Sequence, residues 1–117
     1  MADQAAYLLG LDAGNTIIKA VLFDLAGRQV AMHTVAGRSH TPRPGYVERD
    51  LGDMWAAARD AIRRCIAQAG IDARQIAAVG CAGHGNGLYL IDRVGAPLIG
   101  IQSLDTRAAG MAAELAS

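Results

Sequence analysis

Hydrophobic positions in the first third of the chain form three short runs, which predict three successive β-strands. The runs are rich in β-branched and aliphatic residues, are separated by polar or glycine-containing turns, and cover residues 7–12, 17–24 and 28–35. The first run has apolar residues on both faces, which is typical of a buried central strand. Because turns this short join neighbouring strands, we expect a meander whose second strand pairs antiparallel with the first.

A proline-containing stretch and then a helical pattern follow. Pro42 and Pro44 predict an exposed loop over residues 37–45, with a brief extended segment at residues 46–48. Apolar residues at three- and four-residue steps then predict a helix that Asp50 caps and Gly70 ends. We expect the buried face of this helix to comprise Leu51, Met54, Trp55, Ala58, Ile62, Cys65, Ile66 and Ala69. Its other side, with Arg59, Asp60, Arg63, Arg64 and Gln68, is expected to be a solvated face.

Short apolar runs and glycine-rich turns alternate in the last third of the chain. They predict a strand inside a sheet at residues 75–82, a strand at 88–92, an extended segment at 98–101 and a helix at 106–116. Strands on both sides of a helix favour an α/β fold with a mixed sheet. Residues 50–82 would then form a right-handed crossover.

Composition narrows the class of partner. Hydrophobic residues make up 52% of the 117 residues and charged residues 19%, so a packed core is expected rather than disorder. The formal net charge is zero and there are only one Trp, three Tyr and one Phe, which argues against nucleic-acid binding. We therefore expect a small-molecule partner.

The two cysteines and the N-terminus bear on location. Cys65 and Cys81 show no metal-ligand spacing and are predicted to be reduced core thiols. The N-terminus lacks a basic region and reaches a charge at Asp12, so no signal peptide is predicted, and no apolar run is long enough to span a membrane. A cytoplasmic location is expected.

The turn between the first two strands carries candidate phosphate chemistry. Gly14 and Asn15 permit close backbone approach, Thr16 adds a hydroxyl, Lys19 an amine and Asp12 a carboxylate that could hold Mg²⁺. The spacing matches neither a Walker A loop nor the dinucleotide-binding glycine pattern. Two interpretations fit the residues equally: a phosphate- and metal-binding loop, or an ordinary hairpin with a polar tip.

Two later stretches carry weaker signals. Gly80, Gly83, Gly85 and Gly87 surround a predicted strand end, where ligands of open α/β sheets bind, and His84 and Asn86 could supply hydrogen bonds. The alternative is a loop in which glycine serves backbone geometry alone. Asp105 could accept hydrogen bonds from sugar hydroxyls, or Asp105 or Thr106 could cap the last helix.

Taken together, three segments resemble the FGGY carbohydrate kinases of the actin and hexokinase superfamily. LGLDAGNTIIKAVLFDLAGR resembles their opening phosphate-binding hairpin, and PGYVERDLGDMWAAARDAIRRCI the segment that leads into their first helix. IAAVGCAGHGNGLYLIDRVGAPLIGIQSLDTRA resembles their strand, sugar-contacting loop and following aspartate segment. The similarity runs nearly end to end.

The resemblance implies a ribonuclease-H-like, actin-like α/β fold and transfer of the ATP γ-phosphoryl group, with Mg²⁺, to a sugar or polyol hydroxyl. Asp12 matches the family's metal-side aspartate. The residues that match its phosphate loop are Gly14, Asn15, Thr16 and Lys19. Those that match its sugar contacts are His84, Gly85, Asn86 and Asp105.

Departures from the family pattern bear on the substrate. Xylulokinases have Gln-Met-His in place of His84-Gly85-Asn86 and Trp-Asn-Asp in place of Ser103-Leu104-Asp105. The glycine loop looks closer to the L-xylulose kinase and erythritol kinase branch, which implies a ketopentose or small polyol.

Length is the largest departure. The resemblance implies that the general-base aspartate lies beyond Ser117, together with the adenosine site and the second domain. No catalytic residue is therefore expected within residues 1–117, which would be the N-terminal part of the first actin-like domain and inactive alone. The exposed face of such a segment would allow a homodimer. Two alternatives are a non-catalytic sugar- or nucleotide-binding module and an actin-like assembly role.

Overall fold

The structure is a computed structural model, and it describes residues 4–117. The chain divides into two compact units. The first comprises residues 4–37 and 54–83, and the second comprises residues 38–53 and 84–117. No helix among the described residues is both long and apolar enough to cross a membrane.

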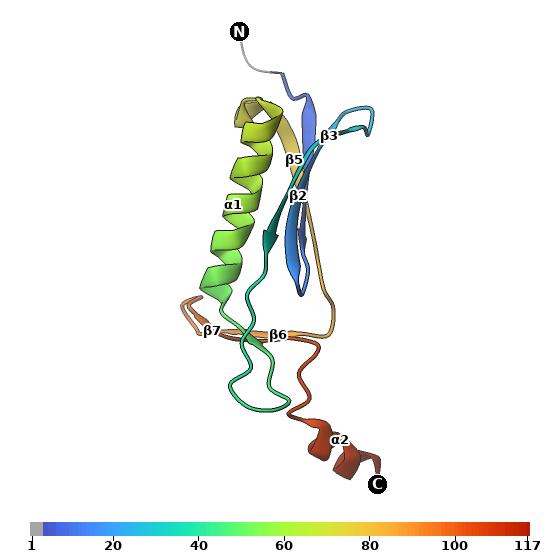
Figure 1. Ribbon diagram of the computed structural model, residues 1–117, viewed down its shortest axis with the longest axis vertical. Helices are drawn as coiled ribbons and strands as arrows, with labels where there is room; N and C mark the ends of the chain where they lie inside the picture. The colour runs from blue at the N-terminus through green and yellow to red at the C-terminus, as the bar shows by residue number, and fades with distance from the viewer. Residues whose placement is uncertain (1–3) are drawn as a thin grey trace. The chain divides into compact units, whose positions relative to one another are not determined.

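The first unit is a four-stranded mixed sheet with one helix on a face. Its strands stand in the order β3-β2-β1-β5, and α1 runs along one face of the sheet (Figure 1). The strands and the helix are β1 (Tyr7–Ala13), β2 (Ile17–Asp24), β3 (Gln29–Ala36), α1 (Leu51–Ala69) and β5 (Ile76–Gly83). Neighbours in the meander pair antiparallel, whereas β1 and β5 pair parallel. The predicted meander and the α/β mixed sheet are therefore confirmed.

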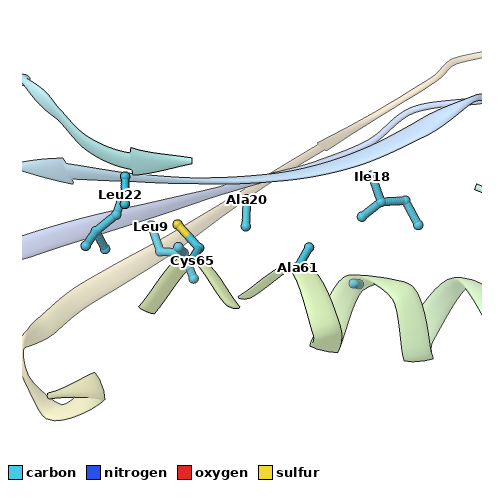
Figure 2. Close-up of a cluster of buried hydrophobic side chains, with 8 residues drawn as sticks. Leu9, Ile18, Ala20, Leu22, Ala61 and Cys65 are labelled. Atoms are coloured by element: carbon cyan, nitrogen blue, oxygen red, sulfur yellow. The ribbon is translucent and has the colours of Figure 1, made fainter. Parts of the chain in front are cut away.

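Small side chains allow α1 to lie close to the sheet. Ile18, Ala20 and Leu22 alternate along β2 and are fully buried. Their side chains point toward Ala61 and Cys65 of α1, which are also fully buried (Figure 2). Strict alternation on β2 thus places its hydrophobic face against the helix and its intervening residues on the other face.

The predicted ends of α1 are confirmed, but its buried face is narrower than predicted. Asp50 caps the helix, since its Oδ1 accepts a hydrogen bond from the Asp53 N–H at 2.8 Å. Trp55, expected inside, is 69% exposed. It lies about a quarter of a turn from the buried Ala58–Ala61–Cys65 line at 100° per residue, so it falls on the flank of the apolar stripe.

β5 and its cysteine differ from the prediction. Among the described residues β5 pairs only with β1, and its residues are mostly exposed, so the expected position inside a sheet is not met there. Cys81 is exposed and is not a core thiol, whereas Cys65 is buried. Burial raises the pKa of the Cys65 thiol. A 3₁₀ turn at Ala73–Gln75, capped by Asp72, precedes β5 and was not predicted.

The second unit contains a small antiparallel sheet of order β4-β7-β6. Its elements are β4 (Glu48–Arg49), β6 (Leu88–Ile91), β7 (Pro97–Ile101) and α2 (Ala109–Ala116). The extended segments predicted at these places are confirmed. α2 begins three residues later than predicted, because Thr106 and Arg107 are held in the preceding loop; the Thr106 N–H donates to the Gly45 carbonyl at 2.7 Å. Neither Asp105 nor Thr106 caps α2.

The sheet–helix core yields a stability prediction. Leu22→Ala removes a fully buried side chain and should lower the free energy of unfolding by about 2–5 kcal/mol. The matched control, Leu25→Ala, changes a side chain that is 63% exposed and should stay within about 0.5 kcal/mol of the parent. Urea unfolding followed by circular dichroism measures both. Equal losses in the two variants would contradict the packing described for β2.

Candidate functional site

The β1–β2 hairpin closes through a turn at residues 14–17. The Gly14 N–H donates to the Ile17 carbonyl at 3.0 Å. A Cβ at Gly14 would lie 2.8 Å from that same oxygen, so only glycine closes the turn without a shift. The Thr16 carbonyl accepts a hydrogen bond from the Gly37 N–H at 2.8 Å, which ties the turn to the end of β3. The conformation of the turn is therefore fixed by backbone hydrogen bonds.

Asp12 and Lys19 face each other across this hairpin. They are register partners on β1 and β2. Because Ile18 and Ala20 point toward α1, Lys19 lies on the opposite face of the sheet, and Asp12 lies there for the same reason on β1. Asp12 is exposed and Lys19 is half-buried. The face of the sheet opposite α1 therefore presents one carboxylate and one amine next to the turn.

A groove of about 380 Å³ runs over this face. Besides Asp12 and Lys19, its lining includes Gly10, Val21, Phe23, Gly80 and Ala82. The small residues on the sheet leave the groove open. At Gly80, for example, a Cβ would point into open space, with nothing within 4 Å. The groove is an open, largely apolar surface with charged groups from the end of the hairpin.

The donor set of the hairpin fits a phosphate and its metal ion. An amide (Asn15), a hydroxyl (Thr16) and an amine (Lys19) can donate to phosphate oxygens. Among residues 4–117 no group of three or more His, Cys, Asp or Glu side chains could hold a metal, so Asp12 would be a single protein carboxylate. Mg²⁺ commonly binds in this way, through one or two carboxylates, phosphate oxygens and water.

The glycines of the loop after β5 serve different purposes. A Cβ at Gly87 would lie 2.7 Å from the Tyr89 ring and 3.2 Å from His84 Nε2, so this glycine makes room for side-chain packing. A Cβ at Gly85 would meet nothing within 4 Å, which leaves the loop open there. Asn86 has a φ of 62°, a left-handed conformation that asparagine tolerates better than most residues. The predicted open approach therefore applies to Gly85 and not to Gly87.

His84 is held by Tyr89, a residue that sequence reasoning missed. The Tyr89 hydroxyl and His84 Nε2 form a hydrogen bond, and the two rings pack at a centroid distance of 5.6 Å. Burial raises the pKa of Tyr89, while the charge and a hydrogen bond of Arg49 act in the opposite direction. Residues 49 and 89 are far apart in the sequence, so no spacing pattern could have joined them.

The Asp105 carboxylate is clamped by the protein. It is 3% exposed and accepts hydrogen bonds from the Val47 N–H at 2.7 Å and from the Arg107 guanidinium at 2.7–3.0 Å. Arg107 also pairs with Glu48 at 2.8 Å and lies over the Tyr46 ring. The Arg107 hydrogen bonds hold the pKa of Asp105 well below its usual range. Asp105 thus joins residues 46–48 to the turn before α2, and its direct contact with a sugar stays a prediction.

The predicted site residues fall into two groups, one in each unit. The first unit brings together the phosphate-loop group, Asp12, Gly14, Asn15, Thr16 and Lys19. The second unit holds the sugar-loop group, His84, Gly85, Asn86 and Asp105. Within the second unit, His84 belongs to the Tyr89 cluster and Asp105 to the Arg107 cluster.

Ser117 marks the limit of what the structure describes. It is the C-cap residue of α2, and its hydroxyl donates a hydrogen bond to the Glu114 carbonyl at 2.7 Å. Ser117 therefore serves the end of the helix and joins neither group of site residues. The general-base aspartate expected beyond Ser117 lies outside the described residues and stays a prediction.

Comparison with known proteins identifies the relatives of this arrangement. Residues 7–117 match the model of the N-terminal domain of the FGGY family of carbohydrate kinases. The chain is 36% identical over 103 residues to the L-xylulose/3-keto-L-gulonate kinase of Escherichia coli K12, covering 87% of this chain and 21% of that protein. It is also 36% identical over 117 residues to the autoinducer-2 kinase of the same strain, covering 98% of this chain and 22% of that protein.

The solved structures agree with the sequence relatives. A xylulose kinase from Brucella ovis matches with a TM-score of 0.87 and 32% identity, over 93% of this chain and 23% of that chain. The chain therefore spans about a fifth of the length of its relatives, and its mixed sheet matches the N-terminal part of the actin-like fold of these kinases. The match over residues 7–117 shows that the chain belongs to the FGGY family of carbohydrate kinases.

Proposed function

We propose that the protein containing these residues is an ATP-dependent kinase that phosphorylates a hydroxyl group of a ketopentose or small polyol. The observation that carries this proposal is the β1–β2 hairpin, in which Asp12 and Lys19 stand opposite each other beside a turn that only glycine closes. Kinases of this family use ATP, and the donors on the hairpin suit its phosphates. Residues 1–117 would form the N-terminal part of the first actin-like domain.

The hairpin would bind the phosphates of ATP together with Mg²⁺. Gly14, Asn15 and Thr16 would supply backbone and side-chain donors, and Lys19 a positive charge. Asp12 would hold Mg²⁺, directly or through water. When bound, the ion would neutralise the charge that the phosphate oxygens carry during transfer. The protein's own contribution is to keep these groups in fixed positions at the end of two paired strands.

The sugar would be contacted from the loop after β5. His84 and Asn86 supply polar groups, and Gly85 leaves the approach open. Asp105 is proposed as a further contact, whose carboxylate is held in place by Arg107 and Val47. L-xylulose is the favoured substrate because the loop looks like that of the L-xylulose branch. Overall identity does not separate the substrates, since the L-xylulose/3-keto-L-gulonate kinase and the autoinducer-2 kinase are both 36% identical to the chain.

The proton-accepting step is assigned to an aspartate beyond Ser117. Asp12 is committed to the metal ion in this proposal, and the Asp105 carboxylate is engaged by Arg107. Residues 1–117 alone should therefore lack kinase activity. A cytoplasmic location is proposed as well, which the free thiols of Cys65 and Cys81 fit. A homodimer stays a prediction.

Asp12→Ala tests the proposed role of the hairpin. In the full gene product, we expect kcat for ATP-dependent sugar phosphorylation to fall by about 100-fold or more, because the metal loses its protein ligand. Asp60→Ala is the matched control, since Asp60 lies on α1 in an exposed pair with Arg64 and should leave kcat unchanged. Full activity in Asp12→Ala would refute the role of the hairpin. Sugar and ATP binding without any turnover in the parent would support a binding module instead.

A substrate panel tests the proposed specificity. L-xylulose, D-xylulose, erythritol and autoinducer-2 are compared at saturating ATP by kcat/KM. We expect L-xylulose to exceed D-xylulose by about tenfold or more, because a loop that hydrogen-bonds hydroxyl groups rejects a misplaced one. A preference for D-xylulose or for autoinducer-2 would overturn the proposed substrate.

Asp105→Asn separates a clamp from a substrate contact. Because the pKa of folded Asp105 lies below the ordinary value of about 4, its carboxylate stabilises the fold above that pH, and the contribution is lost as the pH falls further. The urea midpoint of Asp105→Asn should therefore be lower than that of the parent at neutral pH and fall less between about pH 4 and pH 2. Asp60→Asn is the control and should keep the parent's pH dependence. In the gene product, a direct sugar contact would also raise KM for the sugar, whereas a clamp alone would leave KM unchanged.

A further inference from the structure

Gly100 brings two distant side chains together in the second unit. It is the central residue of a row across the sheet, since it is the register partner of Arg49 on β4 and of Tyr89 on β6. Residues in one row of a sheet point to the same face. Because Gly100 has no side chain, Arg49 and Tyr89 can meet above it.

The space above Gly100 is filled by these neighbours. A Cβ there would lie 2.8 Å from the Arg49 carbonyl oxygen and 2.8 Å from Cε1 of Tyr89. The tyrosine ring therefore lies close against Gly100, where a larger residue would displace it. Arg49 is 2% exposed, so its charge is shielded from solvent.

The charge of Arg49 bears on the direction of the Tyr89–His84 hydrogen bond. Arg49 and Tyr89 flank Gly100 in one row of the sheet, and an arginine can only donate to a tyrosine oxygen. A positive charge on this side favours the arrangement in which the Tyr89 hydroxyl donates to Nε2 of His84. A ring nitrogen that accepts a hydrogen bond carries no proton, so a neutral imidazole in this arrangement has its proton on Nδ1.

We propose that Tyr89 and Arg49 are positioning residues of the carbohydrate site, which orient His84 and hold it in the tautomer with the proton on Nδ1. This inference rests on the proposed function, in which His84 contacts the sugar. The ring nitrogen that carries the proton decides whether a histidine donates to a carbohydrate oxygen or accepts from a hydroxyl. Arg49 and Tyr89 would thus set the hydrogen-bonding pattern that the glycine loop presents, without touching the substrate.

The tautomer is measured in residues 1–117 with ¹⁵N-labelled histidine. This stretch has three histidines, and His84→Gln assigns the signals of His84. We expect Nδ1 of the parent to give the signal of a protonated ring nitrogen and Nε2 that of an unprotonated one. Tyr89→Phe should convert this pattern to a mixture of the two tautomers. Tyr46→Phe, in the same unit, is the matched control and should leave the His84 signals unchanged.

Kinetics of the gene product test the effect on the site. Tyr89→Phe should raise KM for the sugar about 3- to 10-fold, the effect of losing one hydrogen bond, with kcat and KM for ATP unchanged. Gly100→Ala, which displaces the ring, should raise KM in the same way. A merely structural role would lower the yield of active enzyme at unchanged KM.

The outcomes separate this proposal from the proposed function. An unchanged His84 tautomer in Tyr89→Phe overturns the positioning role, whatever the enzyme does. An active kinase whose KM for the sugar is unaffected by Tyr89→Phe also overturns it. A gene product without sugar kinase activity refutes the proposed function, and the positioning role with respect to sugar falls with it, even where the tautomer changes as expected.

Discussion

The close packing of α1 on β2 is the contact on which the first unit depends. Ala20 and Ala61 are both fully buried between larger neighbours, so the helix lies near the sheet and each residue of β2 has a fixed side. Burial of alternate residues specifies strand register, because a shift of one position would turn Ile18 and Leu22 outward. The same constraint sends Lys19, and Asp12 beside it, to the opposite face. The position of the charged groups is thus a consequence of the core.

The second unit is organised by hydrogen bonds and ion pairs more than by apolar burial. Asp105 and Arg107 join residues 46–48 to the turn before α2, and Arg49 and Tyr89 flank Gly100 in one row of the sheet. Hydrogen bonds and ion pairs fix the direction as well as the distance between two groups, which would suit the proposed role of the loop after β5 in contacting a sugar. The short strand β4 takes part in both clusters, because Glu48 pairs with Arg107 and Arg49 lies beside Gly100.

The comparisons show the family and leave the substrate a proposal. The match over residues 7–117 assigns the family, and the actin-like fold follows from it and from the solved structures. The substrate is a finer property, because kinases that act on L-xylulose and on autoinducer-2 are similar to this chain at the same level of identity. In the proposed function, specificity depends on a few side chains of the glycine loop, and differences at so few positions contribute little to overall identity.

The sequence by itself determined the elements of the fold, including the β1–β2 hairpin proposed to bind phosphate, since these depend on local patterns. Alternation and turn residues defined the strands of the meander, Asp50 and Gly70 defined the ends of α1, and the order of three segments indicated the family.

Tertiary structure decided the rest. Trp55 lies on an exposed flank because the width of a buried stripe is set by the partner surface. Asp105 is clamped by Arg107, and Arg49 and Tyr89 flank Gly100 only because three strands pair there. Such contacts join residues far apart in the chain, so local patterns in the sequence do not predict them.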